Sequence, residues 1–172
     1  MPVNVEIKAR VSNPARLQTL AAALSDDSGT LLQQEDTFFH TPQGRLKLRT
    51  FTPTHGELIY YERADATGPT LSSYEIAPTS TPAALTATLA AALGVRGVVR
   101  KQRCVYLLGQ TRVHVDAVEG LGTFVELEWV MQPGQTHAEG VRTVAELMQR
   151  LEITEAELIA GAYIDLLSAS IP

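Results

Sequence analysis

Charged and apolar side chains alternate along much of this 172-residue chain, so that several segments carry one charged face. The lysines and arginines assigned to these faces are Lys8, Arg10, Arg45, Lys47, Arg49, Arg63, Lys101, Arg103 and Arg112. The acidic residues assigned to the same faces are Glu6, Glu75, Asp116, Glu126 and Glu128. Cations neutralise phosphate oxygens, and carboxylates hold hard divalent ions such as Mg²⁺. If the faces line an interior, these residue types predict a site for a polyphosphate and its metal.

The period-two alternation that produces these faces predicts eight strands. The strands are expected at 3–11, 36–40, 45–51, 57–63, 73–77, 98–108, 111–117 and 123–130. Capping residues predict helices over 14–24, 82–93 and 137–151, and a short C-terminal helix starting near Thr154. Strands outnumber helices and come in hairpin-like runs, which favours an α+β fold with a large antiparallel sheet.

The alternation does not by itself show that the sheet closes. An antiparallel sheet commonly has one apolar face and one wet face, so the charged faces could also look at solvent. Amphipathic, alanine-rich helices able to cover the apolar faces favour the other arrangement. In that case the charged side chains line a barrel or trough and need partners there, since buried like charges are costly.

Composition narrows the class of protein. A chain of 172 residues favours one domain, and no apolar run approaches the roughly 18 residues of a membrane span. The net charge of −5 argues against non-specific nucleic-acid binding. Cys104 is the single cysteine, so no disulfide framework forms within one chain, and a reducing cytoplasm is the expected compartment. No nucleic-acid or membrane partner is therefore expected.

Several motifs resemble the CYTH superfamily of triphosphate tunnel metalloenzymes, and the likeness is greatest to bacterial class IV adenylyl cyclases. The family opens on an E-x-E-x-K strand, and "NVEIK" stands here at 4–8. The basic strands "GRLKLR" and "ELIYYER" are similar to family strands, as is the long segment 101–128. The resemblance implies a single CYTH-like domain over 1–172, built as an eight-stranded antiparallel closed β-barrel. Its polar interior would hold a triphosphate with Mg²⁺ or Mn²⁺, and its helices would pack outside.

The resemblance also assigns roles by position. The residues matched to metal binding are Glu6, Asp116 and Glu126, with Glu75 and Glu128 as additions. The residues matched to catalysis on the triphosphate are Lys8, Lys101 and Arg103. The residues matched to triphosphate binding are Arg10, Lys47, Arg49, Arg63 and Arg112. His114, beside Asp116, is interpreted as a structural or hydrogen-bonding histidine.

Three functions remain open at this point. The likeness of 101–126 to class IV cyclases favours conversion of ATP to cyclic AMP and pyrophosphate. The alternative is a triphosphatase acting on thiamine triphosphate, inorganic triphosphate or a nucleotide, because the same charges serve both reactions. The third is a binder without turnover, favoured by Asn4, which stands where the motif has its first glutamate and so removes one negative charge. Oligomeric state is open as well, and a homodimer rests on family analogy alone.

Overall fold

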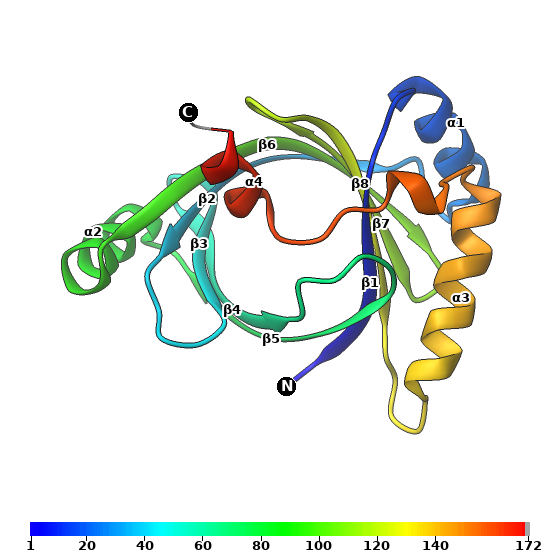
Figure 1. Ribbon diagram of the computed structural model, residues 1–172. Coiled ribbons are helices and arrows are strands. Elements are labelled where there is room, and N and C mark those ends of the chain that lie inside the picture. Colours follow the sequence, from blue (N-terminus) through cyan, green and yellow to red (C-terminus); the bar gives the residue numbers. More distant parts are fainter. Residues whose placement is uncertain (171–172) are drawn as a thin grey trace.

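Eight antiparallel strands close into a barrel in the computed structural model, which describes residues 1–170; residues 171 and 172 of the predicted domain lie outside this part (Figure 1). The order around the barrel is β1-β5-β4-β3-β2-β6-β7-β8. The strands are β1 Val3–Arg10, β2 Thr30–Phe39, β3 Arg45–Thr52, β4 His55–Arg63, β5 Thr70–Thr79, β6 Val95–Leu108, β7 Thr111–Val118 and β8 Gly122–Val130. The expected closed α+β barrel is confirmed.

The helices pack on the outside of the barrel, as expected. They are α1 Pro14–Leu24, α2 Pro82–Leu93, α3 His137–Arg150 and α4 Tyr163–Ala169, with a 3₁₀ turn at Glu155–Glu157. Helix α1 lies against β6 and β7, α3 against β1 and β8, and α2 against β2, β3 and β4. Local chemistry fixes where the helices begin. The Asn13 side chain accepts a hydrogen bond from the Arg16 amide, and Thr136 and Glu139 form a capping box.

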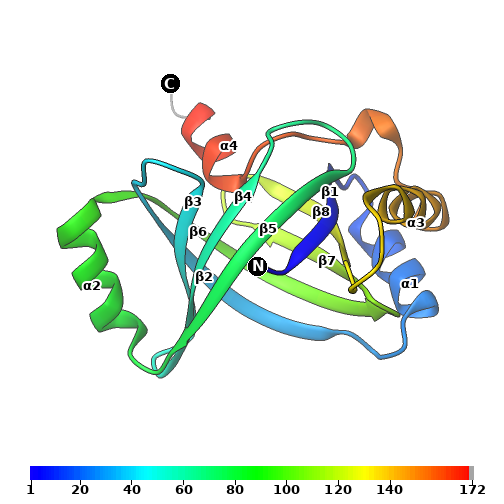
Figure 2. The same cartoon turned by 90° about the horizontal axis from the view of Figure 1, so that it is seen from below.

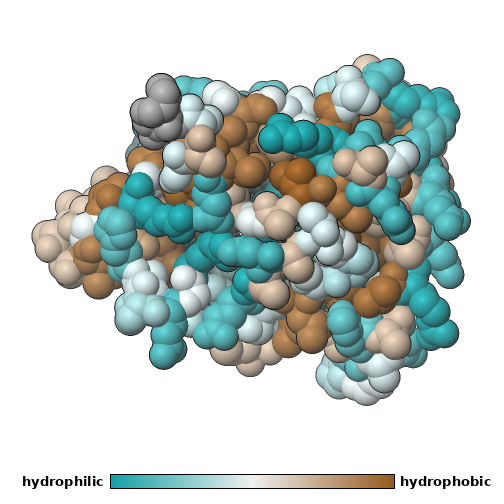
Figure 3. All heavy atoms as spheres, in the orientation of Figure 1, coloured by the Kyte–Doolittle hydropathy of each residue, from teal (hydrophilic) through white to brown (hydrophobic). Residues whose placement is uncertain are grey.

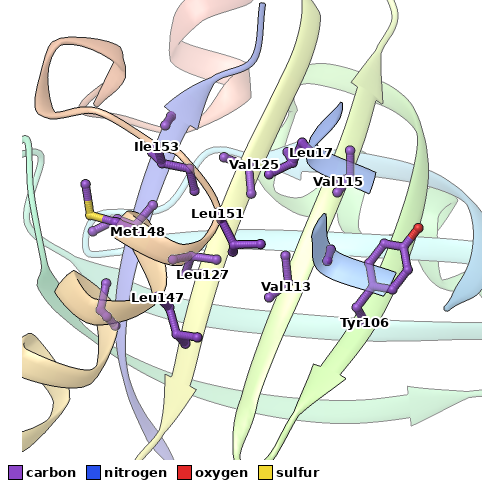
Figure 4. Packing of buried hydrophobic residues seen from close by; sticks show 14 of the residues in the cluster. Leu17, Tyr106, Val113, Val115, Val125, Leu127, Leu147, Met148, Leu151 and Ile153 are labelled. Carbon is purple, nitrogen blue, oxygen red and sulfur yellow. The ribbon is translucent and has the colours of Figure 1, made fainter. Parts of the chain in front are cut away.

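The main hydrophobic core lies between the barrel wall and helices α1 and α3, not inside the barrel (Figure 4). Outward residues of β1, β7 and β8 supply one side of it, and Leu17, Leu147 and Met148 supply much of the other. Because side chains alternate along a strand, burying the odd-numbered residues outward turns the even-numbered charged residues inward. The outer core therefore dictates the polar interior.

The two largest departures from the predicted boundaries concern β2 and the C-terminal helix. Strand β2 begins at Thr30, six residues before the predicted start, and pairs with β6 along its whole length. The segment "TLLQQE" shows no alternation, so periodicity could not reveal this part of the strand. Thr154 does cap a turn with Glu157, but only a single 3₁₀ turn forms, and the C-terminal helix starts at Tyr163.

Helix α4 covers one end of the barrel (Figure 2). Atoms of the described residues fill this end in the space-filling view (Figure 3). A second apolar cluster forms here, in which Tyr163 and Ile164 meet Phe38, Val99 and Phe124 from the barrel. The opposite end carries the β3–β4 turn and the start of β2. No helix in residues 1–170 is long and apolar enough to cross a membrane.

Candidate functional site

A cavity of about 330 Å³ runs inside the barrel. Among residues 1–170, seven lysines and arginines and five carboxylates line it. The cations are Lys8, Lys47, Arg49, Arg63, Lys101, Arg103 and Arg112, and the carboxylates are Glu6, Asp36, Glu57, Glu126 and Glu128. Most of the site residues expected from the sequence are thus brought together in one place.

Strand register arranges these charges in rows across the barrel wall. Glu6 on β1 lies opposite Glu128 on β8, and Glu128 lies opposite Arg112 on β7. In the next row Lys8 lies opposite Glu126, which lies opposite His114 on β7. Each row contains at least one cation, so the buried carboxylates of both rows have a positive charge in the same row.

Asp36 on β2 organises the basic side of the cavity. Its carboxylate accepts hydrogen bonds from Lys101 Nζ at 2.8 Å, from Lys47 Nζ at 3.1 Å, and from Arg49 Nε and Nη2 at 2.8 Å each. Burial opposes ionisation of Asp36, but Arg49, Lys101 and Lys47 outweigh it and hold the pKa of this carboxyl well below its usual range. Asp36 therefore holds three cations together at one point.

Burial dominates the ionisation of the two lysines in this group. Burial, opposed by the charge of Asp36 and helped by that of Arg49, lowers the pKa of Lys101 to about 7. It lowers the pKa of Lys47 to about 8, again helped by Arg49. Both amines therefore change charge close to neutral pH.

A second buried ion group involves Arg103. Its guanidinium donates to Asp116, with Nε 2.6 Å from Oδ1, and also to Glu126 Oε2 at 2.9 Å. Tyr163 donates its hydroxyl hydrogen to Asp116 Oδ2 at 2.8 Å. Both oxygens of Asp116 are thus bound, and the side chain is fully buried and does not line the cavity. Asp116 is placed to orient Arg103, and its assignment as a metal ligand stays a prediction.

Two other expected site residues also lie elsewhere. Glu75 is on the outer face of β5, where its side chain is 60% exposed and Oε1 lies 3.7 Å from the N-terminal amine. The inward residues of β5 are Ser72, Tyr74 and Ile76. The main helix contacts fall on other strands, so the outer face of β5 meets solvent (Figure 1). Polar residues on this strand therefore do not identify the side that faces the cavity.

Arg10 lies at the last position of β1, exposed, with its guanidinium 5.2 Å from the Phe124 ring. Arg45 forms salt bridges with Asp65 and Asp165 beyond the covered end of the barrel. Loss of these two cations, together with the inward placement of Asp36 and Glu57, makes the cavity less basic than the charged faces predicted.

The acidic side of the cavity could hold a divalent metal. His114, Glu126 and Glu128 each offer a ligand atom, and these atoms lie within 4.8 Å of one another. Glu6 lies opposite Glu128 in the same row and is bound by Arg63 Nη1 at 2.7 Å. Burial, and after it the charge of Glu128, raises the pKa of Glu6. A divalent cation placed here would relieve this crowding of buried carboxylates.

Sequence reasoning missed Asp36 and Glu57. Glu57 shares the parity of Ile59, Tyr61 and Arg63 in β4, so alternation alone could have found it. Asp36 stood at the predicted start of its strand, where a polar residue is typical of a turn. Asp36 could be recognised as a residue within a strand only if the first half of β2 had been predicted, and that half shows no alternation of polar and apolar residues.

The closed antiparallel barrel thus encloses one cavity in which clustered cations lie beside clustered carboxylates. The model of the CYTH domain matches residues 3–163, and the chain belongs to this family. It is 28% identical over 171 residues to adenylate cyclase CyaB of Aeromonas hydrophila, covering 92% of this chain and 85% of that protein.

Solved structures share the fold. The PH1012 protein of Pyrococcus horikoshii OT3 superposes with a TM-score of 0.82 at 23% identity, covering 95% of this chain and 98% of that one. HpAC1 from Hippeastrum, a proposed adenylyl cyclase described as having a dominant triphosphatase activity, superposes with a TM-score of 0.66 at 17% identity. That match covers 98% of this chain and 97% of the other.

Proposed function

We propose that this chain binds the triphosphate of ATP with a divalent metal inside the barrel and converts ATP to cyclic AMP and pyrophosphate. The observation that carries the proposal is the convergence of seven cations and five carboxylates, all within residues 1–170, on one cavity. A triphosphate with a divalent ion needs both kinds of group. The similarity to a named adenylate cyclase over nearly the whole chain favours cyclisation as the reaction.

The residues present fit Mg²⁺ or Mn²⁺. Glu6, Glu126 and Glu128 offer carboxylate oxygens inside the cavity. Asn4 Oδ1 and His114 Nδ1 are buried acceptors with no hydrogen-bond partner in the described part of the chain, and both residues line the cavity. A bound ion would neutralise phosphate charge and lower the pKa of the attacking ribose hydroxyl.

The protein's own contribution is position and charge. In the proposed reaction the ribose 3′-hydroxyl loses its proton to water, its oxygen bonds to the α-phosphorus, and the bond from that phosphorus to the departing pyrophosphate breaks. Lys47, Arg49 and Lys101 already converge on a carboxylate, so their donors are arranged to receive phosphate oxygens and the charge that grows on pyrophosphate. Arg103, fixed by Asp116, and Lys8, whose Nζ lies 3.9 Å from the centre of the Tyr163 ring, reach the same cavity from the covered end.

Apolar side chains line part of the cavity end opposite α4. Leu32, Phe51 and Ile76 line this end, close to where β2 starts, β3 ends and β5 ends. Aromatic and aliphatic side chains of this kind suit the flat face of a base. A nucleotide lying with its phosphates toward Lys101 and its base toward Phe51 is consistent with this distribution.

A triphosphatase is the second candidate. Its support is HpAC1, which has the same fold and is described as having a dominant triphosphatase activity. Hydrolysis would use the same cations to hold the chain of phosphates and would direct water to the terminal phosphorus. The charge arrangement serves either reaction, so the products must decide.

Incubation of the purified protein with ATP and Mn²⁺ or Mg²⁺, followed by chromatography and phosphorus NMR, tests the proposal. Cyclic AMP with pyrophosphate is the expected result. ADP with orthophosphate would contradict cyclisation and support the triphosphatase. Absence of any product from ATP, thiamine triphosphate or tripolyphosphate would contradict both reactions, and a rise in melting temperature with these ligands would then support a binder.

Tripolyphosphate binding is expected to take up protons at pH 8. In the free cavity burial keeps the pKa of Lys101 at about 7 and that of Lys47 at about 8, so both amines are partly neutral. A bound anion favours their charged forms and raises both pKa values, hence affinity falls as pH rises above this range. Calorimetry in buffers of different ionisation enthalpy measures the uptake, and Lys101→Met should reduce it. An enthalpy independent of the buffer would contradict the expectation.

A further inference from the structure

One polar side chain of the cavity wall has no part in the proposed reaction. Gln34 lies on β2, lines the cavity and is 5% exposed. On the same strand Asp36 is the next inward residue toward Phe38 and the end covered by α4, and Leu32 is the next inward residue toward the other end. The Gln34 amide therefore stands between the three cations bound to Asp36 and the apolar side chains proposed to meet the base.

The strands on the two sides of β2 place a cation and an aromatic ring next to Gln34 (Figure 1). On β6, Lys101 lies directly opposite Gln34. On β3, Thr50 lies opposite Glu35. The next residue of β3 is Phe51, which therefore comes beside Gln34 and also lines the cavity. A nucleotide with its base against Phe51 and its phosphates toward Lys101 would pass the amide where the base joins the rest of the molecule.

The amide oxygen of Gln34 lacks a partner. Oε1 is buried and accepts no hydrogen bond from residues 1–170. Lys101, although opposite in register, donates to Asp36 at 2.8 Å instead. Leaving a buried acceptor unsatisfied is costly, so the position of Oε1 indicates that a donor from outside the protein chain completes it.

Neither the phosphates nor a metal ion suits this acceptor. Ionised phosphate oxygens only accept hydrogen bonds. A divalent cation is disfavoured here because Lys47, Arg49 and Lys101 converge on the neighbouring carboxylate. The remaining donors are the N–H groups of a base, the ribose hydroxyls and water. The ring of Phe51 beside the amide favours the base, whereas water in this place would make no distinction between bases.

The glutamine amide matches one edge of adenine. It carries an acceptor, Oε1, beside a donor, Nε2. Adenine carries the complementary pair, the 6-amino donor and the N7 acceptor, and glutamine makes this bidentate contact in the major groove of DNA. Guanine has two acceptors on the same edge, O6 and N7, so one of them would face Oε1 in either orientation of the amide. In an anti nucleotide the N7 edge lies on the side of the 5′-phosphates, which is the side on which Gln34 stands.

We propose that Gln34 selects the base of the substrate: Oε1 accepts a hydrogen bond from the 6-amino group of adenine, and Nε2 donates one to N7. The contact favours adenine nucleotides over guanine nucleotides, because guanine would place an acceptor against Oε1. Gln34 is then a specificity-determining residue that touches the substrate away from the reacting phosphorus. The inference rests on the proposed function in taking a nucleotide as the ligand, with its base beside Phe51.

Calorimetric binding of α,β-methylene-ATP and α,β-methylene-GTP, each with Mg²⁺, tests the selection. The methylene bridge prevents loss of pyrophosphate, and phosphorus NMR of the recovered ligands verifies that they are intact. The wild-type protein should bind the adenine analogue at least about tenfold more tightly. Gln34→Leu should bring this ratio close to one and leave the affinity for tripolyphosphate unchanged. Gln33→Leu is the matched control and should keep the wild-type ratio, because Gln33 is the preceding residue of β2 and is exposed on its outer face.

A wild-type ratio near one would overturn the proposal, and this measurement does not depend on the folding of any variant. A preference for adenine that persists in folded Gln34→Leu would overturn it as well, and equal weakening of all three ligands would identify a structural side chain instead. Binding of tripolyphosphate without either analogue would overturn it together with the nucleotide substrate. Because neither analogue can be cyclised, ADP as the product from ATP would exclude the cyclase and leave the selection of adenine standing. Cyclic AMP formed by a protein without base preference would leave the cyclase and remove this role of Gln34.

Discussion

Replacement of Lys101 by methionine is expected to lower turnover at least about a hundredfold while the protein stays folded. The Lys101 side chain is 1% exposed, and its amine is one of three cations bound to Asp36 at the centre of the basic group. Its loss removes a charge that would stabilise the departing phosphate. Stability should change little, because Asp36 keeps Lys47 and Arg49 and because a buried like charge disappears from beside Arg49 and Arg103.

Arg100→Met is the matched control for this experiment. Arg100 precedes Lys101 on β6 but faces outward, where it pairs with Glu35 on the surface, both side chains being about half exposed. Turnover and melting temperature should both stay near wild type. Melting is followed by circular dichroism and turnover by product formation from ATP. A folded Lys101→Met protein with wild-type turnover would exclude Lys101 from the reaction, and an unfolded one would identify a structural ion pair.

The fold was largely readable because the outer core imposes a strict alternation. Val113, Val115 and Val125 must face helices α1 and α3, so their neighbours on β7 and β8 face inward. Capping residues gave the starts of α1, α2 and α3 for an equally local reason. Closure of the barrel is different, since it depends on the pairing of β2 with β6 and of β1 with β5 and β8, which no local pattern encodes.

Alternation failed where helices do not cover the wall. On β5 the apolar-bodied Tyr74 and Ile76 face the cavity and Glu75 faces solvent. On β1, β7 and β8 the charged residues face the cavity and the apolar residues face outward. Polarity marks the inner face of a strand only if the opposite face is buried against something apolar. The assignment of Glu75 to the site followed from applying that rule to a strand whose outer face meets solvent.

The contacts of Asp116 with Arg103 and Tyr163 could not be predicted from its position in a motif. The register places it in the row of Arg103 and Phe124, next to the covered end of the barrel. There the hydroxyl of Tyr163, 47 residues later in the chain, donates a hydrogen bond to Oδ2 of Asp116. Such a contact depends on where α4 comes to rest, and the sequence pattern carries no sign of it.

Replacement of Asp36 by alanine is expected to destabilise the fold by about 3–5 kcal/mol, because it leaves buried cations without their counter-charge. The deficit should shrink as pH rises from 6 to 9. Burial already holds the pKa of Lys101 near 7 and that of Lys47 near 8, and removal of Asp36 lowers both further. The unfolded chain then binds more protons than the native one over this range, so stability rises with pH. Urea unfolding at several pH values measures the deficit.

Tripolyphosphate should restore part of what Asp36→Ala loses, because its oxygens can take the place of the missing carboxylate among Lys47, Arg49 and Lys101. We expect it to raise the melting temperature of this variant by more than that of the wild type. Glu35→Ala is the matched control, since Glu35 is the preceding residue of β2 and makes only the surface pair with Arg100. It should cost under about 1 kcal/mol and respond to tripolyphosphate as the wild type does. Two outcomes would contradict this expectation: an Asp36→Ala protein as stable as Glu35→Ala, and an Asp36→Ala protein that tripolyphosphate fails to stabilise. Either would show that the Asp36 carboxylate is not needed to offset the repulsion among the cations around it. In that case Asp36 would not hold the place that the phosphates come to occupy.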